Sequence, residues 1–340
     1  MIMAIRLCQW DIVGTCNLNC TYCRQKILSG LPHLPKGQVF KIIDKLVASE
    51  VEIVSLAGGE PLTLSFLPEV LRYLRGKVKQ IIVTTNGTLI KIPQAEMLKE
   101  YCSEVQVSID GSCSAIHDQF RGRGTFDRAI AAVRLLVEMG VTVVLRLTIC
   151  RENKDDTGNY VRLAHELGVR AAYLRRALPI GNYQNGDVLR PEELYAAFKD
   201  AFDQGKKFGI HVGSADYFSQ LEFDRRERDK AEKNIAERPN QILSGCSIGI
   251  DAFYLTQDGK VLFCPYLPVY CGDLTKQSLS DVWDNSEMMN ISRNIRWNQT
   301  GKCAACRFRM SCGGCPAYIF LTTGKLTESD GGCWVNDPVC

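Results

Sequence analysis

The sequence predicts an α/β protein built on a parallel sheet, because short apolar strands alternate with amphipathic helices along its first half. Six segments rich in apolar and β-branched residues are typical of strands, and a helix or a long connection separates each from the next. Parallel neighbours need such crossovers. The predicted strands are residues 5–13, 51–56, 80–85, 104–109, 141–149 and 169–174.

The clearest predicted helix is residues 126–139, FDRAIAAVRLLVEM, whose apolar residues share one face and which Gly140 ends. Residues 221–240 are strongly charged, which is typical of a solvated helix between two modules. Beyond them the periodicity fades and cysteine becomes frequent. We therefore expect three parts, a barrel-type domain at 1–220, a charged linker helix at 221–240 and a small cysteine-rich domain at 241–340.

Composition excludes several classes of protein. The net charge of +3 over 340 residues is too small to indicate nucleic acid or an anionic membrane as a partner. No run of about eighteen uncharged apolar residues occurs, and the amino terminus lacks a signal-peptide pattern, so a cytoplasmic location is expected. In that compartment the sixteen cysteines are better explained by metal ligation or catalysis than by disulfides.

Polar and glycine-containing segments follow the predicted strands. A three-cysteine loop follows the first strand, GGEP follows the second, and TTNG and SIDG end the third and fourth. The carboxyl ends of parallel strands meet at one rim of a sheet, where ligands bind in such folds. We therefore expect the active site at this rim.

The loop after the first strand holds Cys16, Cys20 and Cys23 in a C-x3-C-x2-C pattern. Chance is one alternative, and zinc is another. A structural zinc site needs four ligands, however, and the nearest histidine is His33. A four-iron cluster suits the loop better, because three thiolates hold three irons and leave the last iron open to another ligand.

The segment CNLNCTYC, followed about 35 residues later by GGEP, resembles the radical S-adenosylmethionine (SAM) superfamily. The resemblance implies a partial (β/α)6, TIM-like barrel in which SAM chelates the open iron, and reductive cleavage of SAM gives a radical that abstracts a substrate hydrogen. It also implies that Gly58 and Gly59 let backbone approach SAM closely and that Glu60 accepts a hydrogen bond from its ammonium. Tyr22 would lie near the adenine, with plain packing as the alternative.

Later strand-end segments resemble the same family and imply further SAM contacts by Asn86, Ser108 and Arg121. Turn chemistry is the alternative role for Asn86. For His117 we expect a local structural hydrogen bond, as is usual for a lone histidine. Cys150, at the end of the fifth predicted strand, is a candidate hydrogen-atom donor. The default for the other scattered cysteines is a buried or incidental thiol, namely Cys8, Cys102, Cys113 and Cys340.

The carboxyl-terminal cysteines resemble the SPASM extension of radical SAM enzymes. Twelve residues separate Cys246 from Gly259, four separate Gly259 from Cys264, and CAACRFRMSCGGC follows. One departure is the C-x2-C spacing at the end of that segment, where the SPASM pattern has C-x3-C. A zinc ribbon is the alternative. The resemblance implies two auxiliary [4Fe-4S] clusters, one on Cys303, Cys306, Cys312 and Cys333 and one on Cys246, Cys264 and Cys315, with Cys271 as the candidate fourth ligand.

For function, the resemblance favours maturation of a ribosomally made peptide or protein by cross-linking, thioether formation or oxidation. The second hypothesis is dehydrogenation, epimerisation or decarboxylation of a small molecule such as an aminoglycoside sugar or a tetrapyrrole. A non-catalytic iron–sulfur sensor or scaffold is the third, and the intact GGEP argues against it. An electron donor such as flavodoxin or ferredoxin is expected. The first cysteine is at position 16, so no leader-binding domain is expected before the barrel.

Overall fold

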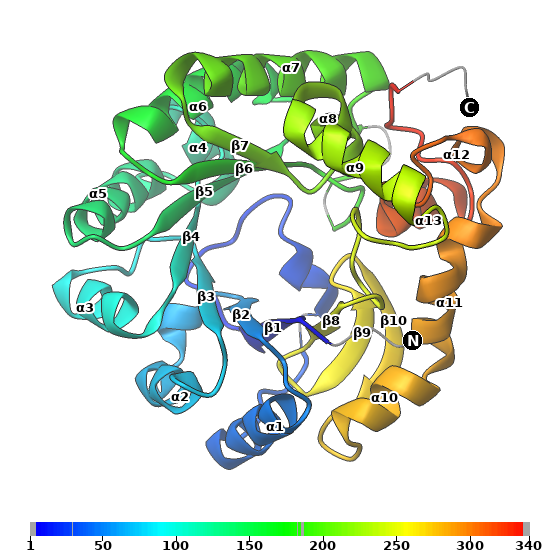
Figure 1. The fold of residues 1–340 in the computed structure, drawn as a ribbon. Coiled ribbons are helices and arrows are strands. Elements are labelled where there is room, and N and C mark those ends of the chain that lie inside the picture. The colour runs from blue at the N-terminus through cyan, green and yellow to red at the C-terminus, as the bar shows by residue number, and fades with distance from the viewer. Residues whose placement is uncertain (1–4, 29, 182, 185–186, 336–340) are drawn as a thin grey trace.

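The computed structural model describes residues 5–335 apart from 29, 182, 185 and 186. Ten strands form one sheet in the order β10-β9-β8-β1-β2-β3-β4-β5-β6-β7, and it curves into an open barrel with helices outside (Figure 1). The strands from β8 through β1 to β7 are parallel, and β9 and β10 are added antiparallel. Their bounds are β1 Leu7–Val13, β2 Ile53–Gly58, β3 Gln80–Thr85, β4 Glu104–Ser108, β5 Val143–Ile149, β6 Ala171–Arg176, β7 His211–Ser214, β8 Ala252–Leu255, β9 Lys260–Cys264 and β10 Leu267–Asp273.

The helices follow the strands and cover the outer face of the barrel. In the first two thirds of the chain they are α1 Lys36–Ala48, α2 Leu67–Leu74, α3 Ile92–Tyr101, α4 Ser114–Arg121, α5 Thr125–Glu138, α6 Thr157–Glu166, α7 Pro191–Phe208, α8 Tyr217–Phe223 and α9 Arg225–Glu237. Those nearer the carboxyl terminus are α10 Leu279–Asn285, α11 Glu287–Asn294, α12 Gly301–Ala305 and α13 Pro316–Thr323. Short 3-10 helices lie at Arg24–Leu28, Pro61–Thr63, Lys154–Asp156 and Ile295–Asn298.

All six predicted strands are present, and the helix predicted at 126–139 is α5, displaced by one residue. The charged segment forms α9, in which Ala231 alone is buried. The sequence did not predict β7, which has only four residues, or the β8–β10 extension. Because β8 pairs with β1, the sheet itself continues into the cysteine-rich region, and the boundaries 1–220 and 241–340 remain a proposal.

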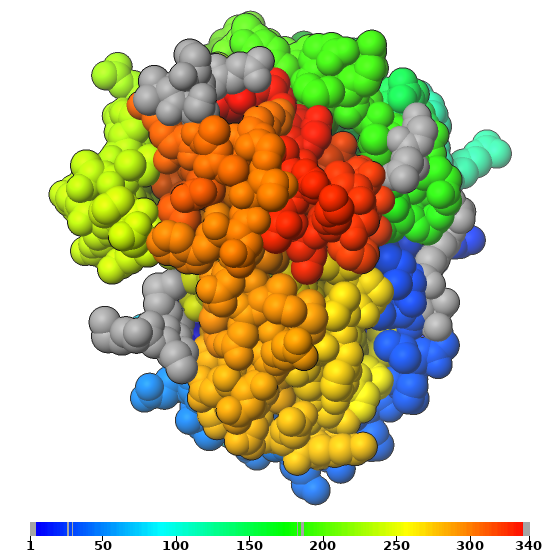
Figure 2. Space-filling view, turned by 90° about the vertical axis from the view of Figure 1, so that its right-hand side faces the viewer, coloured from blue at the N-terminus to red at the C-terminus, as the bar shows by residue number. Residues whose placement is uncertain are grey.

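The carboxyl-terminal segments pack directly on this extension. In Figure 2 the orange and red residues lie against the yellow strands β9 and β10 and against the green segments of the barrel. The cysteine-rich region therefore packs against the side of the barrel. Residue Cys340, expected to be an incidental thiol, lies outside the described residues.

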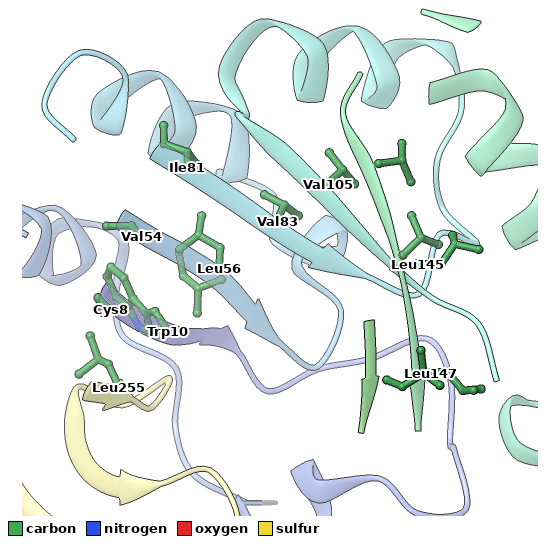
Figure 3. Close-up of a cluster of buried hydrophobic side chains, with 14 of the residues drawn as sticks. Cys8, Trp10, Val54, Leu56, Ile81, Val83, Val105, Leu145, Leu147 and Leu255 are labelled. Atoms are coloured by element: carbon green, nitrogen blue, oxygen red, sulfur yellow. The ribbon is translucent and has the colours of Figure 1, made fainter. Parts of the chain in front are cut away.

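The barrel strands have two chemically different faces. Outward side chains such as Trp10, Leu56 and Val83 are fully buried and form the core against the helices (Figure 3). Inward side chains such as Gln9 and Thr84 are polar and line a cavity. Successive residues of a strand point to opposite faces, so each strand contributes to the core and to the cavity at once.

The core prediction is tested at Leu56, which is 0% exposed. Leu56→Ala is expected to lower the free energy of unfolding by about 3 kcal/mol, because it removes buried methyl groups and leaves a void. A urea titration followed by circular dichroism measures it. The matched control is Ile92→Ala, since Ile92 is 60% exposed. Its effect should stay within about 0.5 kcal/mol. Equal losses in the two variants would contradict the assignment of this core.

Candidate active site

The inner faces of the barrel strands enclose a cavity of about 250 Å³. The loop that follows β1 crosses the centre of the barrel (Figure 1) and brings Cys16, Cys20 and Cys23 to the cavity wall. Residues at the strand ends also line the cavity, as does Tyr266 in the turn between β9 and β10. The cavity therefore lies at the rim where the order of strands predicts the active site, and it is the candidate site.

The three loop thiols are close enough to influence one another. Burial raises the pKa of Cys16, and it raises that of Cys20 to about 11, with the neighbouring thiols adding to both shifts. The amide of Leu18 lies 3.4 Å from the Cys16 sulfur and the side-chain amide of Asn86 lies 3.9 Å from it. Within the described residues, no group of three His, Cys, Asp or Glu side chains is arranged to hold a single metal ion. A cluster in which each thiolate holds its own iron fits thiols spread around a cavity.

Gly58 and Gly59 bring the GGEP turn directly against the chain that leaves β1. The amide of Gly59 donates to the Val13 carbonyl at 2.6 Å, and a Cβ on Gly59 would lie 2.0 Å from the Thr15 carbonyl oxygen. Gly58 has a φ of 128°, which side-chain-bearing residues rarely adopt. Both glycines line the cavity. The close approach that they allow is thus between the turn and the cysteine loop.

Glu60 is fully buried and its carboxylate is already engaged by the protein. It accepts hydrogen bonds from Thr85 Oγ1 at 2.6 Å, from the amide of Asn86 at 2.7 Å and from the amide of Leu62 at 3.2 Å. Burial raises its pKa, and these three donors oppose the shift. Glu60 does not line the cavity. Glu60 thus holds the backbone of Asn86, and its contact with the SAM ammonium remains a prediction.

Asn86 and Ser108 both line the cavity, and their contact with SAM remains a prediction. The Asn86 side-chain amide donates to Asn17 Oδ1 at 2.9 Å, while its own oxygen accepts from the Thr88 amide at 2.9 Å. Asn86 thus stabilises its own turn and also contacts the cysteine loop. Ser108 lies at the carboxyl end of β4.

Tyr22 and Arg121 are joined through Asp110, an acid whose central place the sequence analysis missed. Asp110 is fully buried, forms an ion pair with Arg121 and accepts the Tyr22 hydroxyl, and Arg121 also donates to that hydroxyl at 3.0 Å. His117 Nδ1 accepts the Asp110 amide at 3.1 Å, and burial lowers its pKa to about 4. The expected structural role of His117 is therefore confirmed. An acid directly after a buried strand was the available signal for Asp110.

Cys150 is not among the cavity residues. It is fully buried in a small cluster with Phe120 and Tyr183, behind Tyr22, and its amide donates to Asn153 Oδ1 at 2.7 Å. Burial raises the pKa of its thiol. The structure thus does not bring Cys150 to the site, and its suggested role as hydrogen-atom donor gains no support.

Four carboxyl-terminal cysteines surround a second, small cavity of about 30 Å³, whose walls include Phe218 and Phe308. Burial raises the pKa of Cys333 to about 11 and raises that of Cys312 as well. The donor set and the apolar walls fit an iron–sulfur cluster. The four are those predicted to act together, Cys303, Cys306, Cys312 and Cys333.

Cys246, Cys264 and Cys315 form the other group. Burial, together with the other two thiols, raises the pKa of Cys264 to about 12. Cys271 is separate from them. It lies on β10, where its thiol donates to the Val269 carbonyl at 3.6 Å. The β-ladder places it about three residues along the strand from Cys264, roughly 10 Å away. The arrangement gives no support to Cys271 as the fourth ligand.

Arg296 lies between the two carboxyl-terminal cysteine groups and is 5% exposed. It donates to the Cys246 carbonyl at 3.0 Å and to the Met310 carbonyl. Burial lowers its pKa, while the thiols of Cys246 and Cys312 act in the opposite direction. A buried cation at this place fits thiolate-ligated clusters on both sides.

A buried ion-pair network ties the barrel to the cysteine-rich region. Arg176, at the end of β6, pairs with Asp216 at 2.8 Å and with Asp330 at 2.5 Å. Asp330 also accepts the amide of Cys315 at 2.9 Å. The position of that cysteine relative to the barrel is thereby fixed by a charged contact that water does not reach.

Comparison with known proteins agrees with this geometry. The description of the radical SAM superfamily matches residues 10–164, and that of the SPASM iron–sulfur cluster-binding domain matches residues 246–307. An AdoMet-dependent heme synthase of Methanosarcina barkeri is 28% identical over 98% of this chain and 97% of its own length. The mycofactocin maturase MftC of Mycolicibacterium smegmatis is 29% identical over 95% of this chain and 81% of its own.

The fold has solved counterparts. Streptococcus suis SuiB, solved with its precursor peptide SuiA, superimposes with a TM-score of 0.79 at 17% identity, over 98% of this chain and 77% of that one.

The chain is a radical SAM enzyme: it belongs to the radical SAM superfamily and carries the SPASM extension. Its cofactors are accordingly SAM, a [4Fe-4S] cluster and auxiliary iron–sulfur clusters. In the described part of the chain, no helix has the length and apolar character needed to cross a bilayer.

The turn geometry makes a prediction at Gly59. Gly59→Ala is expected to weaken SAM binding at least tenfold, about 1.4 kcal/mol, because the new Cβ forces the GGEP turn away from Thr15. Equilibrium dialysis of the anaerobically reconstituted protein measures it, with circular dichroism to confirm folding. The control is Gly331→Ala, where a Cβ meets nothing within 4 Å. Unchanged affinity in a folded Gly59→Ala protein would contradict the assignment.

Proposed function

We propose that Cys16, Cys20 and Cys23 hold the radical-generating cluster and that the enzyme removes a hydrogen atom from a substrate bound in the barrel. The observation that carries this is that all three thiols open onto the same cavity as the polar inner faces of the strands. When bound, the cluster and SAM supply one-electron chemistry, in which reductive cleavage of SAM gives a radical that can abstract a hydrogen atom from an organic substrate.

The residues around the cavity have separable roles in this proposal. Tyr22, Ser108, Asn86 and Arg121 bind SAM, together with the backbone of the GGEP turn. Buried Asp110 holds Tyr22 and Arg121 in place through the contacts described above. Water is excluded from one side by the apolar packing of Phe120 against the Tyr22 ring, with centroids 5.7 Å apart.

The carboxyl-terminal cysteines supply two further clusters in this proposal. Cys303, Cys306, Cys312 and Cys333 hold one, and Cys246, Cys264 and Cys315 hold the other. The second group lies next to the cavity, since Cys264 ends the strand that precedes Tyr266. It is placed to accept the electron that remains when a substrate radical becomes a closed-shell product. A flavodoxin or ferredoxin type of protein is proposed as the donor to the first cluster.

For the substrate we propose a tetrapyrrole that bears carboxylate side chains. The support is the heme synthase of Methanosarcina barkeri, which this chain matches over nearly the whole length of both proteins. The proposed reaction is oxidative decarboxylation. One hydrogen atom leaves the carbon next to the carboxyl-bearing carbon, the carbon–carboxylate bond breaks to release carbon dioxide, a carbon–carbon double bond forms, and one electron passes to an auxiliary cluster.

Peptide modification, the first hypothesis from the sequence, is the second candidate. Its support is the likeness to mycofactocin maturase MftC and the fold shared with SuiB, which was solved with a precursor peptide. We rank the tetrapyrrole first because AdoMet-dependent heme synthases of three organisms match this chain at 25–28% identity over 96–98% of its residues.

Cys16→Ala is expected to abolish formation of 5′-deoxyadenosine, because a cluster ligand is lost. The measurement is chromatography of anaerobic reactions containing SAM and dithionite, together with the iron content of the protein. Cys113→Ala is the matched control, since Cys113 is an exposed thiol at the start of α4. It should keep wild-type product and iron. Wild-type product from the Cys16 variant would refute the proposed role of the loop.

The ranking of substrates is tested by offering the enzyme two kinds of compound. Iron coproporphyrin III is expected to lose mass corresponding to carbon dioxide and hydrogen, as seen by mass spectrometry. Peptides encoded by genes beside this one are the other arm. Modification of such a peptide, with the porphyrin left intact, would reverse the ranking while leaving the radical chemistry in place.

A further inference from the structure

Four arginines line the cavity, and two of them are neutralised by the protein itself. Arg24 pairs with buried Asp11, with a distance of 2.7 Å from Nη2 to Oδ1. Arg121 pairs with Asp110. These two ion pairs brace the cysteine loop and the end of β4, and their charges cancel within the wall.

The other two, Arg146 on β5 and Arg175 on β6, form no ion pair with any described residue. Arg146 donates to Gln106 Oε1 at 2.6 Å, and its guanidinium carbon lies 4.8 Å from the centre of the Tyr173 ring. Arg175 donates to the Tyr266 hydroxyl and lies 3.9 Å from the centre of that ring. Neutral groups thus orient both side chains. No described carboxylate lies within ion-pair distance of either guanidinium, although Asp216, which pairs with Arg176, interacts with the charge of Arg175 at longer range.

The two guanidinium groups are neighbours. In the register of β5 with β6, Arg146 lies opposite Tyr173 and Thr148 lies opposite Arg175, so both arginines point from the inner face at adjacent levels. Burial lowers the pKa of Arg146, and the charge of Arg175 lowers it further. Two adjacent cations in a partly dry cavity destabilise the empty protein. Such a cost is offset when an anion binds between them.

We infer that Arg146 and Arg175, with the Tyr266 hydroxyl, form the anchor for a carboxylate group of the substrate. A guanidinium presents a planar pair of donors that matches a carboxylate, and pre-oriented aromatic neighbours reduce the entropy lost on binding. The identity of the compound as a carboxylated tetrapyrrole rests on the proposed function. The anion site itself rests only on the two arginines that form no ion pair with a described residue.

The anchor is a positioning device for the reaction. It lies on the strands β5 and β6, whereas the cysteine loop comes from β1, so a substrate held by its carboxylate extends across the cavity toward the radical source. Tyr266 adds a contact from the β9–β10 turn, next to Cys264. A substrate at this anchor therefore touches both the barrel and the cysteine-rich region.

Binding of coproporphyrin III to the reconstituted full-length protein, measured by anaerobic fluorescence titration, tests the anchor. Each of Arg146→Gln and Arg175→Gln is expected to weaken binding at least tenfold. Arg175→Lys should weaken it less, because lysine keeps the positive charge but lacks the two parallel donors of the guanidinium group. The methyl ester of the same porphyrin should bind weakly to the wild type and equally to all variants. Arg134→Gln, on the exposed face of α5, is the matched control and should bind as the wild type does.

Turnover separates positioning from structure. The arginine variants are expected to raise KM more than they lower kcat, while their thermal melting follows that of the control. Loss of SAM affinity with porphyrin affinity retained would overturn the inference, because it would assign the arginines to the cofactor. Equal binding of the acid and its ester by the wild type would overturn it as well.

A second probe separates this inference from the proposed substrate. If a glutamate-rich peptide binds and the porphyrin does not, and the arginine variants lose the peptide, the anion site stands and the tetrapyrrole proposal falls. If neither probe binds the wild type, the anion site is refuted.

Discussion

The alternation of side chains along the parallel strands is the constraint on which the rest of the structure depends. Each strand must present apolar groups outward to the helices and polar groups inward, and a shift of one residue would exchange the two sets. Trp10 and Leu56 show the outward face, and Gln9 and Arg146 show the inward face. The stability of the barrel and the chemistry of its cavity are therefore fixed by the same registers.

Charged side chains that line a cavity inside a barrel are costly to bury unless each is paired with an opposite charge. Asp11, within β1, and Asp110, just after β4, each neutralise an arginine, and both acids are buried. On the outer side of the sheet, Asp216 and Asp330 neutralise Arg176. These ion pairs attach the cysteine-rich region to the barrel. Removal of one partner from such a pair leaves an unbalanced buried charge, which is strongly destabilising. These contacts are thus structural, and the two inner-wall arginines without an ion pair among the described residues stand out against them.

Much of this arrangement follows from the sequence, because strand periodicity and the order of crossovers bring the strand-end motifs to one rim. The six strands, α5 and the position of the cysteine loop could be predicted in this way. The contact partners of Glu60 could not, since hydrogen bonds to Thr85 and to the Asn86 amide depend on the packing of two strands. Cys271 illustrates the same limit: the sequence makes it a candidate fourth ligand, yet its place on β10 separates it from Cys264.

Electron paramagnetic resonance of the reduced protein tests the central claim most directly, namely that three thiols on the cavity wall leave one iron open to SAM. Spectra of the wild type and of a Cys16, Cys20 and Cys23 triple alanine variant are recorded with and without SAM. The account predicts that SAM changes one cluster signal of the wild type, and that this signal is missing from the variant while the auxiliary signals remain. A wild-type spectrum that saturating SAM leaves unchanged would contradict it.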